Sequence, residues 1–327
     1  QPAIDNEEAH HWVMPFDLKT DKTTIAMPEG PTASSIALDV LEDHINNGEK
    51  IMAINAAIPG VFGLDRIKNK YPENYHDVGI AEQESVAFAA GMAKEGATPV
   101  LFENSTFLQR AFDQLSHDVA ANDLPVVMMV AGGGISGTSK THLGVFDQVM
   151  ISNLPNWIYL APTNLAEEKA MMEWAIKQKK HPVAIKMPTK DVPEGKEITA
   201  VDYSEIKYDI KPGKDVAVLA LGDMYDMLGK KVAEKTGASL VNPVSANILD
   251  TAALDKLAQE NKVIVTIEDN ILDGGFGEKV ASYLGDKDIK VLNYGQKRVY
   301  TDQVPLKEIL KDNRMTVDQI VEDIENA

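Results

Sequence analysis

The sequence contains no cysteine, which excludes disulfides, thiolate metal sites and a cysteine nucleophile. It also contains no apolar run near the roughly 20 residues that a membrane-spanning helix needs. Basic residues are few, with 32 Lys and Arg against 50 Asp and Glu, a formal charge of −18. Such a surface repels a phosphate backbone, so we expect no nucleic-acid partner and no membrane association. We expect a cytoplasmic protein.

The 327 residues are enough for two domains of ordinary size, and the 44% hydrophobic and 25% charged fractions are typical of a globular protein. The chain begins Gln1-Pro2-Ala3, without a methionine, and residues 1–24 are mostly polar and irregular. That composition is typical of a linker between domains. We therefore expect a processed or cut piece of a longer protein.

Helices and strands alternate from about residue 31. Apolar runs predict strands at 50–54, 99–102, 126–131, 157–160 and 183–186, with helices at 32–45, 82–95, 106–121 and 166–177. A segment rich in proline, glycine and charge follows, and then a second alternating unit has strands at 215–221, 239–241, 263–268 and 290–292. The pattern predicts an α/β protein with two doubly wound, mostly parallel-sheet domains at 25–192 and 212–327, joined by a connector at 193–211.

A glycine-rich turn follows the strand predicted at 126–131. Residues 132–137, Gly-Gly-Gly-Ile-Ser-Gly, formally match GxGxxG. A dinucleotide-binding turn also needs a following helix and an acidic residue about 20 positions on. Residues 138–144 show no helical stripe, and the next strand ends in Ala161-Pro162-Thr163. The context therefore favours glycines that let backbone approach a ligand, or a flexible loop at the carboxyl edge of the sheet.

A carboxylate lies on an apolar helix face in the run 75–96. On a helix starting near Ala81, Glu82 shares its face with Val86, Ala89 and Ala93. A buried carboxylate costs free energy unless a hydrogen bond satisfies it, which makes Glu82 a candidate site residue. The alternative is a first-turn glutamate favoured by the helix dipole.

The next helix, predicted at 106–121, carries two further candidates. Thr106 and Gln109 match a T-x-x-Q capping box, and Phe107 and Arg110 then lie at the helix start, beside the end of a strand. The alternative is that Phe107 belongs to the core and Arg110 to the charged surface.

Taken together, these segments resemble the thiamine-diphosphate-dependent transketolase family, and most of all its 1-deoxy-D-xylulose-5-phosphate synthase branch. The resemblance rests on IAEQ-x(4)-FAAGMA at 80–93, STFLQRAFDQLSHDVA at 105–120, THLGVFDQ at 141–148 and TIEDNILDGGFGEKV at 266–280. The segment His11 to Asp17 is similar to the family's connector between its first two domains. The resemblance implies a pyrimidine-binding domain followed by a transketolase C-terminal domain.

The resemblance also implies roles for individual residues. Glu82 would hydrogen-bond the ring nitrogen N1′ of thiamine diphosphate, Phe107 would stack on its pyrimidine, and Ile80 would belong to the same cofactor pocket. Arg110, His142 and Lys140 would contact substrate. His142 would be the second catalytic residue, giving or taking protons at substrate oxygens, with a packed loop histidine as the alternative.

The family binds the cofactor's diphosphate through Mg²⁺ on a separate N-terminal domain, by a GDG motif followed by asparagines. This chain has no such motif, since Gly222-Asp223-Met224 lacks the second glycine and lies in the wrong domain. We therefore expect no metal ligands here, and a missing N-terminal half or separate subunit as the partner that carries Mg²⁺. The family also forms close dimers, so we expect a homodimer.

The chain departs from the synthase branch where that branch carries two arginines that grip the acceptor's phosphate. Here those regions read Ala131 to Gly134 and Met187 to Lys190, and Lys140, Lys186 and Lys190 are the lysines available. Glu84 also stands where the synthases carry histidine. Lysine does not reproduce bidentate phosphate binding by arginine.

Three functions remain open. The first is a transferase of the synthase type, which joins pyruvate to glyceraldehyde 3-phosphate with loss of CO2. The second is a transketolase that moves a two-carbon unit between sugars. The third is a non-catalytic subunit.

Overall fold

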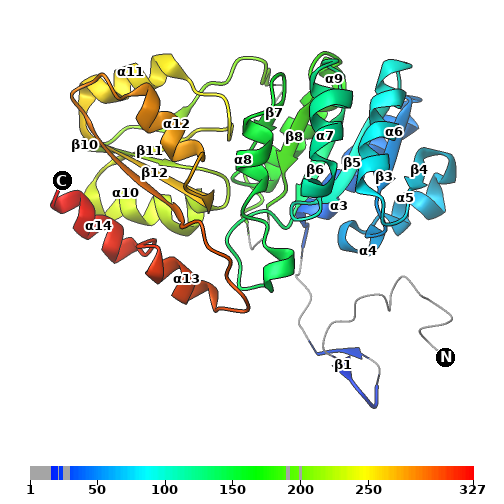
Figure 1. The fold of residues 1–327 in the computed structure, drawn as a ribbon, viewed down its shortest axis with the longest axis horizontal. Coiled ribbons are helices and arrows are strands. Elements are labelled where there is room, and N and C mark those ends of the chain that lie inside the picture. Colours follow the sequence, from blue (N-terminus) through cyan, green and yellow to red (C-terminus); the bar gives the residue numbers. More distant parts are fainter. Residues whose placement is uncertain (1–15, 21, 25–29, 189–191, 199–200) are drawn as a thin grey trace.

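The computed structural model describes residues 16–20, 22–24, 30–188, 192–198 and 201–327. Two separate sheets lie side by side, each covered by helices (Figure 1). Most of the predicted linker at 1–24, including His11 to Pro15, lies outside the described residues, and a two-stranded ribbon is formed by β1 (Phe16–Asp17) and β2 (Lys22–Thr23).

The first sheet has six strands, all parallel, in the order β4-β3-β5-β6-β8-β7. Its strands are β3 (Ile51–Asn55), β4 (Tyr75–Asp77), β5 (Thr98–Asn104), β6 (Val127–Ala131), β7 (Ile158–Leu160) and β8 (Val183–Lys186). The three central strands are almost wholly buried, as the apolar runs predict for a parallel sheet covered on both faces. Because the strands are parallel, their carboxyl ends meet at one edge of the sheet.

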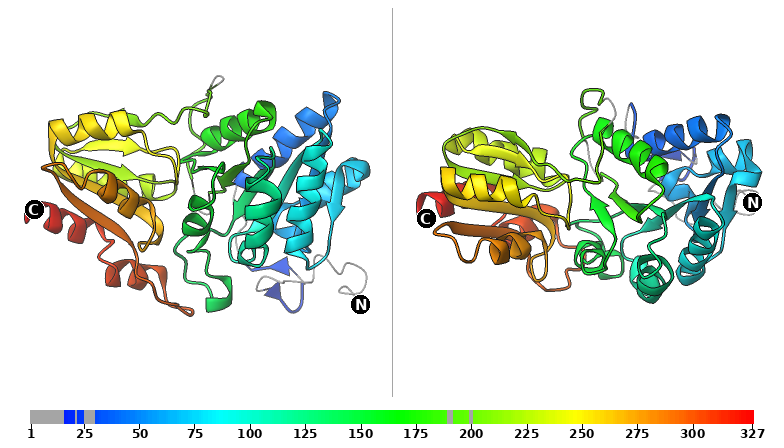
Figure 2. Two further views of the ribbon diagram at one scale, coloured as in Figure 1. Left: turned by 45° about the horizontal axis from the view of Figure 1, so that its top comes forward. Right: turned by 90° about the horizontal axis from the view of Figure 1, so that it is seen from above.

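Helices cover both faces of this sheet (Figure 2). The helices α3 and α9 pack together on one face, and α6 packs on the other, mainly against β5. The α-helices of this domain are α3 (Ala33–Asn46), α4 (Pro59–Phe62), α5 (Asp65–Lys70), α6 (Glu82–Lys94), α7 (Phe112–Gln114), α8 (Asp147–Ser152) and α9 (Leu165–Gln178).

The prediction of a regular helix at 106–121 is wrong in detail. A 3-10 turn (Leu108–Ala111) leads into α7 and then into a π-helical turn (Leu115–Ala120). The Thr106 hydroxyl does not cap the helix. Instead the Gln109 side-chain amide donates to the Thr106 carbonyl at 2.7 Å. The Trp157 indole N–H donates to the Leu115 carbonyl at 3.2 Å, so a distant residue occupies an acceptor that a regular helix would use itself.

The second sheet has five strands in the order β13-β12-β10-β11-β9, and β9 pairs antiparallel while the others are parallel. Its strands are β9 (Asp209–Lys211), β10 (Asp215–Ala220), β11 (Ser239–Asn242), β12 (Asn261–Ile271) and β13 (Lys290–Gln296). Its α-helices are α10 (Lys230–Thr236), α11 (Thr251–Glu260), α12 (Phe276–Tyr283), α13 (Leu306–Asp312) and α14 (Val317–Glu325). The predicted fold class, two mostly parallel α/β sheets, is confirmed.

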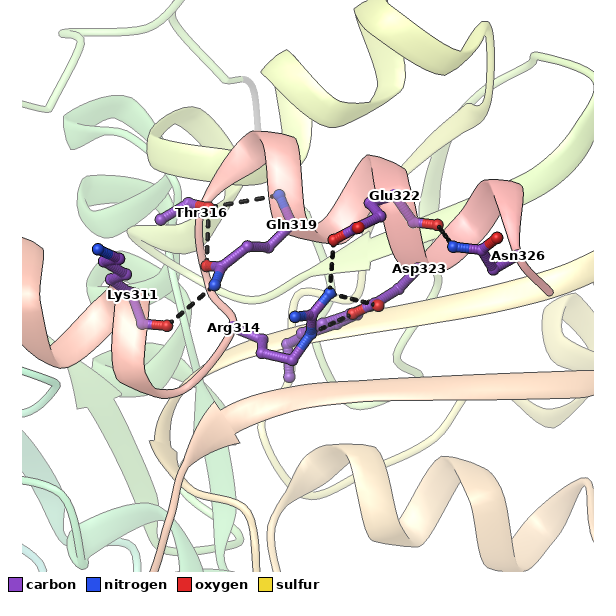
Figure 3. A network of polar contacts seen from close by, with 8 residues as sticks. Lys311, Arg314, Thr316, Gln319, Glu322, Asp323 and Asn326 are labelled. Carbon is purple, nitrogen blue, oxygen red and sulfur yellow. Dashed lines mark hydrogen bonds and ion pairs between the residues drawn. The ribbon is translucent and has the colours of Figure 1, made fainter.

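Ion pairs of Arg314 stabilise the turn between the two C-terminal helices, α13 and α14 (Figure 3). Arg314 lies between α13 and α14 with φ of 57°, and its guanidinium contacts Asp323 at 2.6 Å and Glu322 at 3.0 Å. Thr316 caps the start of α14 by accepting from the Gln319 backbone N–H. These contacts fix the turn that brings α14 back against α10.

A buried ion pair joins the two domains. Lys186, at the end of β8, contacts Asp269 of β12 at 2.5 Å, and each side chain is less than 5% exposed. Asp147 lies beside this pair and accepts from the Tyr159 hydroxyl and, at 3.2 Å, from the Asn270 amide. Burial by itself lowers the pKa of Lys186, but the negative charges of Asp269 and Asp147 outweigh it and raise that pKa to about 12. Lys186 therefore stays charged.

Candidate active site

Glu82 is the first residue of α6 and lies at the carboxyl edge of the first sheet, a few residues beyond the end of β4. Its residue is 3% exposed, as the apolar stripe predicts. The Arg110 guanidinium approaches Glu82 Oε2 to 2.9 Å as an ion pair, but Oε2 accepts no hydrogen bond of acceptable geometry. A buried carboxylate oxygen without a donor is costly, so this atom can take a donor from a bound molecule.

A chain of contacts runs from Glu82 through Arg110 and Phe107 to His142. Phe107 and Arg110 start the irregular segment after β5, and Arg110 is half exposed on the solvent side of its ion pair. The rings of Phe107 and His142 meet edge to face, with centroids 5.8 Å apart. The Thr106 hydroxyl donates to the Thr141 carbonyl at 3.4 Å, which ties the loop of His142 to the end of β5.

The other two predicted site residues lie at the rim. Ile80 is 69% exposed on the loop immediately before α6. Lys140 is exposed, and its backbone N–H donates to Asp302 Oδ1 of the C-terminal domain at 3.1 Å. The structure thus links Glu82 to Arg110, Arg110 to Phe107 and Phe107 to His142, and it leaves Ile80 and Lys140 open to solvent.

The glycines after β6 pack against the protein itself. The Gly134 N–H donates to the Gly144 carbonyl at 2.6 Å, and a Cβ on Gly144 would overlap the Gly132 carbonyl oxygen. Gly134 has φ of 116°, and a Cβ there would collide with the Asp269 carboxylate. No helix follows β6 directly, since the next element is a 3-10 turn (Lys140–His142). The glycines therefore serve close backbone packing, and the geometry is not that of a dinucleotide turn.

The lysines considered for phosphate binding differ in how accessible they are to a substrate. Lys186 is 3% exposed and paired with Asp269, so it is not a free cation for a substrate. Lys190 lies outside the described residues. Among the predicted site residues, which all lie in the described part of the chain, the lysine and arginine side chains are the exposed Lys140 and the ion-paired Arg110.

Two site residues were missed in the sequence. Glu103, in β5, is fully buried, and its Oε1 lies 2.9 Å from the hydroxyl of Ser85 in α6. The same hydroxyl lies 2.8 Å from the backbone carbonyl of Glu82. The signal for Glu103 was its position directly after the apolar run 99–102, within a buried strand where a charged side chain is unexpected.

Across residues 16–20, 22–24, 30–188, 192–198 and 201–327, no group of three or more His, Asp or Glu side chains is arranged to hold a metal ion. Over the same residues, no helix is both long enough and apolar enough to span a bilayer.

Comparison with known families agrees with this geometry. Residues 30–194 match the model of the transketolase pyrimidine-binding domain, and residues 204–320 match that of the transketolase C-terminal domain. The chain therefore belongs to the transketolase family, and the resemblance read from the sequence is confirmed.

Relatives within the family are similar over almost all of this chain. It is 36% identical over 322 residues to 1-deoxy-D-xylulose-5-phosphate synthase 1 of Geobacter sulfurreducens, covering 95% of this chain and 50% of that protein. It is 37% identical over 300 residues to the synthase of Pseudoalteromonas translucida, covering 90% of this chain and 48% of that protein. The chain spans about half the length of the curated relatives it matches.

A solved structure described as a split gene transketolase, inactive beta4 tetramer, has the same fold. The TM-score is 0.78 at 24% identity, and the match covers 91% of this chain and 98% of that one.

Proposed function

We propose that this chain supplies the pyrimidine-binding and C-terminal domains of a thiamine-diphosphate-dependent transferase of the 1-deoxy-D-xylulose-5-phosphate synthase type. The observation that carries the proposal is the buried Glu82 carboxylate at the carboxyl edge of the sheet, whose Oε2 forms an ion pair with Arg110 but accepts no hydrogen bond of acceptable geometry. The synthase relatives support the choice of reaction, which joins pyruvate to glyceraldehyde 3-phosphate with loss of CO2.

The residues present fit the pyrimidine half of thiamine diphosphate. Glu82 Oε2 suits a protonated ring nitrogen, because such a nitrogen supplies a well-aligned donor, which the Arg110 ion pair does not. Phe107, which is partly buried beside His142, offers an aromatic face for the ring, and Ile80 offers an apolar side chain at the rim. Thiamine diphosphate, when bound, supplies a nucleophilic carbon that attacks carbonyl groups.

Each protein group then has a defined task. Glu82 exchanges a proton with the ring nitrogen, and its burial keeps competing water away. Arg110 balances the charge of Glu82 from the solvent side and faces the position where substrate would enter. His142 is placed to give or accept protons at substrate oxygens, and Lys140 adds positive charge at the rim.

The test uses the complete assembly, this chain with the half that carries the diphosphate and Mg²⁺ site. Carbon-labelled pyruvate and glyceraldehyde 3-phosphate are supplied with thiamine diphosphate and Mg²⁺, and the label is followed by NMR. Label in deoxyxylulose phosphate supports the proposal. Transfer from ketose donors without pyruvate turnover would favour the alternative, a transketolase. The departures at the expected arginines and the burial of Lys186 are the observations that favour this alternative. No turnover with either donor would indicate a non-catalytic subunit.

Removing the aromatic side chain of Phe107 should weaken cofactor binding. We expect Phe107→Ala to raise the dissociation constant of thiamine diphosphate by about tenfold, because a stacked aromatic contributes about 0.5–1.5 kcal/mol beyond its buried area. Turnover at saturating cofactor should fall much less. Isothermal titration measures the affinity, and Phe112→Ala, at an exposed residue of the same segment, is the matched control. Equal affinities for the two variants would contradict the role given to Phe107.

We also propose that the chain works as a homodimer together with a separate or covalently joined diphosphate-binding half. The outer face of α6 supports a protein contact, because a mostly apolar hollow there is lined by Ala87, Phe88, Gly91, Met92 and Ala97, with Glu84 and Glu95 also in its lining. The split-gene relative shows that a chain of this extent exists as a subunit of its own in that protein. We expect analytical ultracentrifugation of this chain to give the mass of two copies of the chain, and a strictly monomeric profile would contradict the proposal.

A further inference from the structure

The side chain of Glu103 is buried directly behind the helix turn that carries Glu82. It extends from β5 toward α6 and contacts Ser85. The residue opposite it in the neighbouring strand β6 is the uncharged Val130. The other oxygen, Oε2, is buried and has no hydrogen-bond partner. An ionised carboxylate in this position would leave one charged oxygen without a donor, which is costly.

The single hydrogen of the Ser85 hydroxyl bears on the protonation state of Glu103. The Ser85 hydroxyl lies within hydrogen-bond distance of the Glu82 carbonyl (2.8 Å) and of Glu103 Oε1 (2.9 Å), and it carries a single hydrogen. A carbonyl oxygen can only accept, so satisfying both contacts requires Ser85 to donate to Glu82 and to accept from Glu103. Glu103 can donate only as a neutral carboxylic acid.

The surrounding charges act in the same direction. Burial is the largest cause that raises the pKa of Glu103, and the negative charges of Glu82 on α6 and of Asp77 at the end of β4 add to it. Together they outweigh the lowering effect of the Ser85 hydroxyl and bring that pKa to about 8. The Asp77 carboxylate accepts hydrogen bonds from the backbone N–H groups of Ala57 and Gly79. The Arg110 guanidinium pairs with Glu82, not with Glu103.

We propose that Glu103 is held as a neutral acid that donates to Ser85 Oγ, and that this neutral acid is a positioning residue which lets the adjacent Glu82 carry negative charge. The negative charge of Glu82 acts on Glu103, and two carboxylates that interact in a buried site disfavour each other's ionisation. A proton kept on Glu103 therefore lets Glu82 release its own proton to a bound ring nitrogen. Loss of the Glu103 proton at high pH makes Glu82 hold its proton more tightly. The role toward Glu82 rests on the function proposed above, whereas the protonation of Glu103 does not.

Infrared spectroscopy of the complete assembly without cofactor tests the protonation directly, since a protonated carboxyl group has a C=O band distinct from that of a carboxylate. The difference between the wild type and Glu103→Gln should contain one such band at pH 7, and the band should vanish with a midpoint near pH 8. Absence of the band at pH 7 would overturn the proposal.

Ser85→Ala gives a second test that leaves Glu103 in place, including in the case where Glu103→Gln does not fold. Removing an acceptor of the neutral acid should shift the midpoint of the band to lower pH. A shift to higher pH would mean that Ser85 donates to a Glu103 carboxylate, and the proposal would be wrong.

The effect on Glu82 is read from the pH profile of thiamine-dependent turnover. The turnover rate of the wild type should fall above about pH 8. The rate of Glu103→Gln, whose side chain cannot ionise, should not fall in this alkaline limb of the profile. A limb that persists unchanged in the variant would overturn the positioning role. An infrared band that titrates as expected in an assembly with no thiamine-dependent turnover would uphold the neutral acid and reject the proposed function, so the two failures are distinguishable.

Discussion

Glu82→Gln is expected to reduce thiamine-dependent turnover of the complete assembly by a factor on the order of 10²–10⁴, the usual contribution of a positioned acid or base. Glutamine keeps the size and burial of the side chain but cannot exchange a proton with a ring nitrogen. The ion pair with Arg110 is lost, yet Arg110 is half exposed and solvent can take over its charge. Steady-state rates at saturating cofactor are the measurement.

The fold should survive this change. We expect the far-ultraviolet circular dichroism and the unfolding midpoint of Glu82→Gln to stay close to those of the wild type. Glu73→Gln makes the same chemical change at an exposed residue upstream of the site, and it is the matched control for activity. Near-normal turnover of Glu82→Gln would remove the central residue of the proposed function.

Lys186→Met is expected to destabilise the protein by about 3–5 kcal/mol, the usual cost of removing one partner of a buried ion pair. The variant leaves Asp269 buried beside Asp147 with no cation between them, since Lys186 is the group that contacts Asp269 at 2.5 Å. The loss appears as a lower midpoint of urea unfolding.

Two further variants make this test specific. Lys177→Met removes an exposed lysine that pairs with Glu173 four residues away, and it should change stability by less than about 0.5 kcal/mol. The double variant Lys186→Met/Asp269→Leu removes both charges and should recover much of the lost stability. If Lys186→Met unfolds like Lys177→Met, the pair does not hold the domains together.

The fold followed from local patterns to a large extent. The strand predicted at 183–186 has those bounds in the structure, and the helix predicted from 82 begins at Glu82. Such elements are set by the period of their own apolar residues. The segment 106–121 is different, because its π-helical turn contacts the indole of Trp157, a partner that lies far away in sequence. A capping pattern read from Thr106 and Gln109 could not include that partner.

The candidate site was predictable only where its residues lie on short motifs. Glu82 and Phe107 stand in such motifs, and the structure brings both to one edge of the sheet. Glu103 and the Asp269 partner of Lys186 were not foreseen, because each depends on which strand and helix meet in three dimensions. Lys186 was considered as a phosphate ligand, and its pairing across the domain boundary shows why a lysine's sequence position does not give its availability.

The loop that carries His142 is held by hydrogen bonds at its base and near its tip. At its base Gly134 bonds to Gly144, and near its tip the Thr138 carbonyl accepts from the Gln303 N–H while Lys140 donates to Asp302, both from the C-terminal domain. Glu82 and Phe107, in contrast, are held within the first domain. A small rotation between the domains would therefore act on the His142 loop through Thr138 and Lys140, against the contact that Thr106 of the first domain makes with Thr141. The choice of substrate could thus be retuned in evolution by residues of the C-terminal domain, with the cofactor-binding half of the site left untouched.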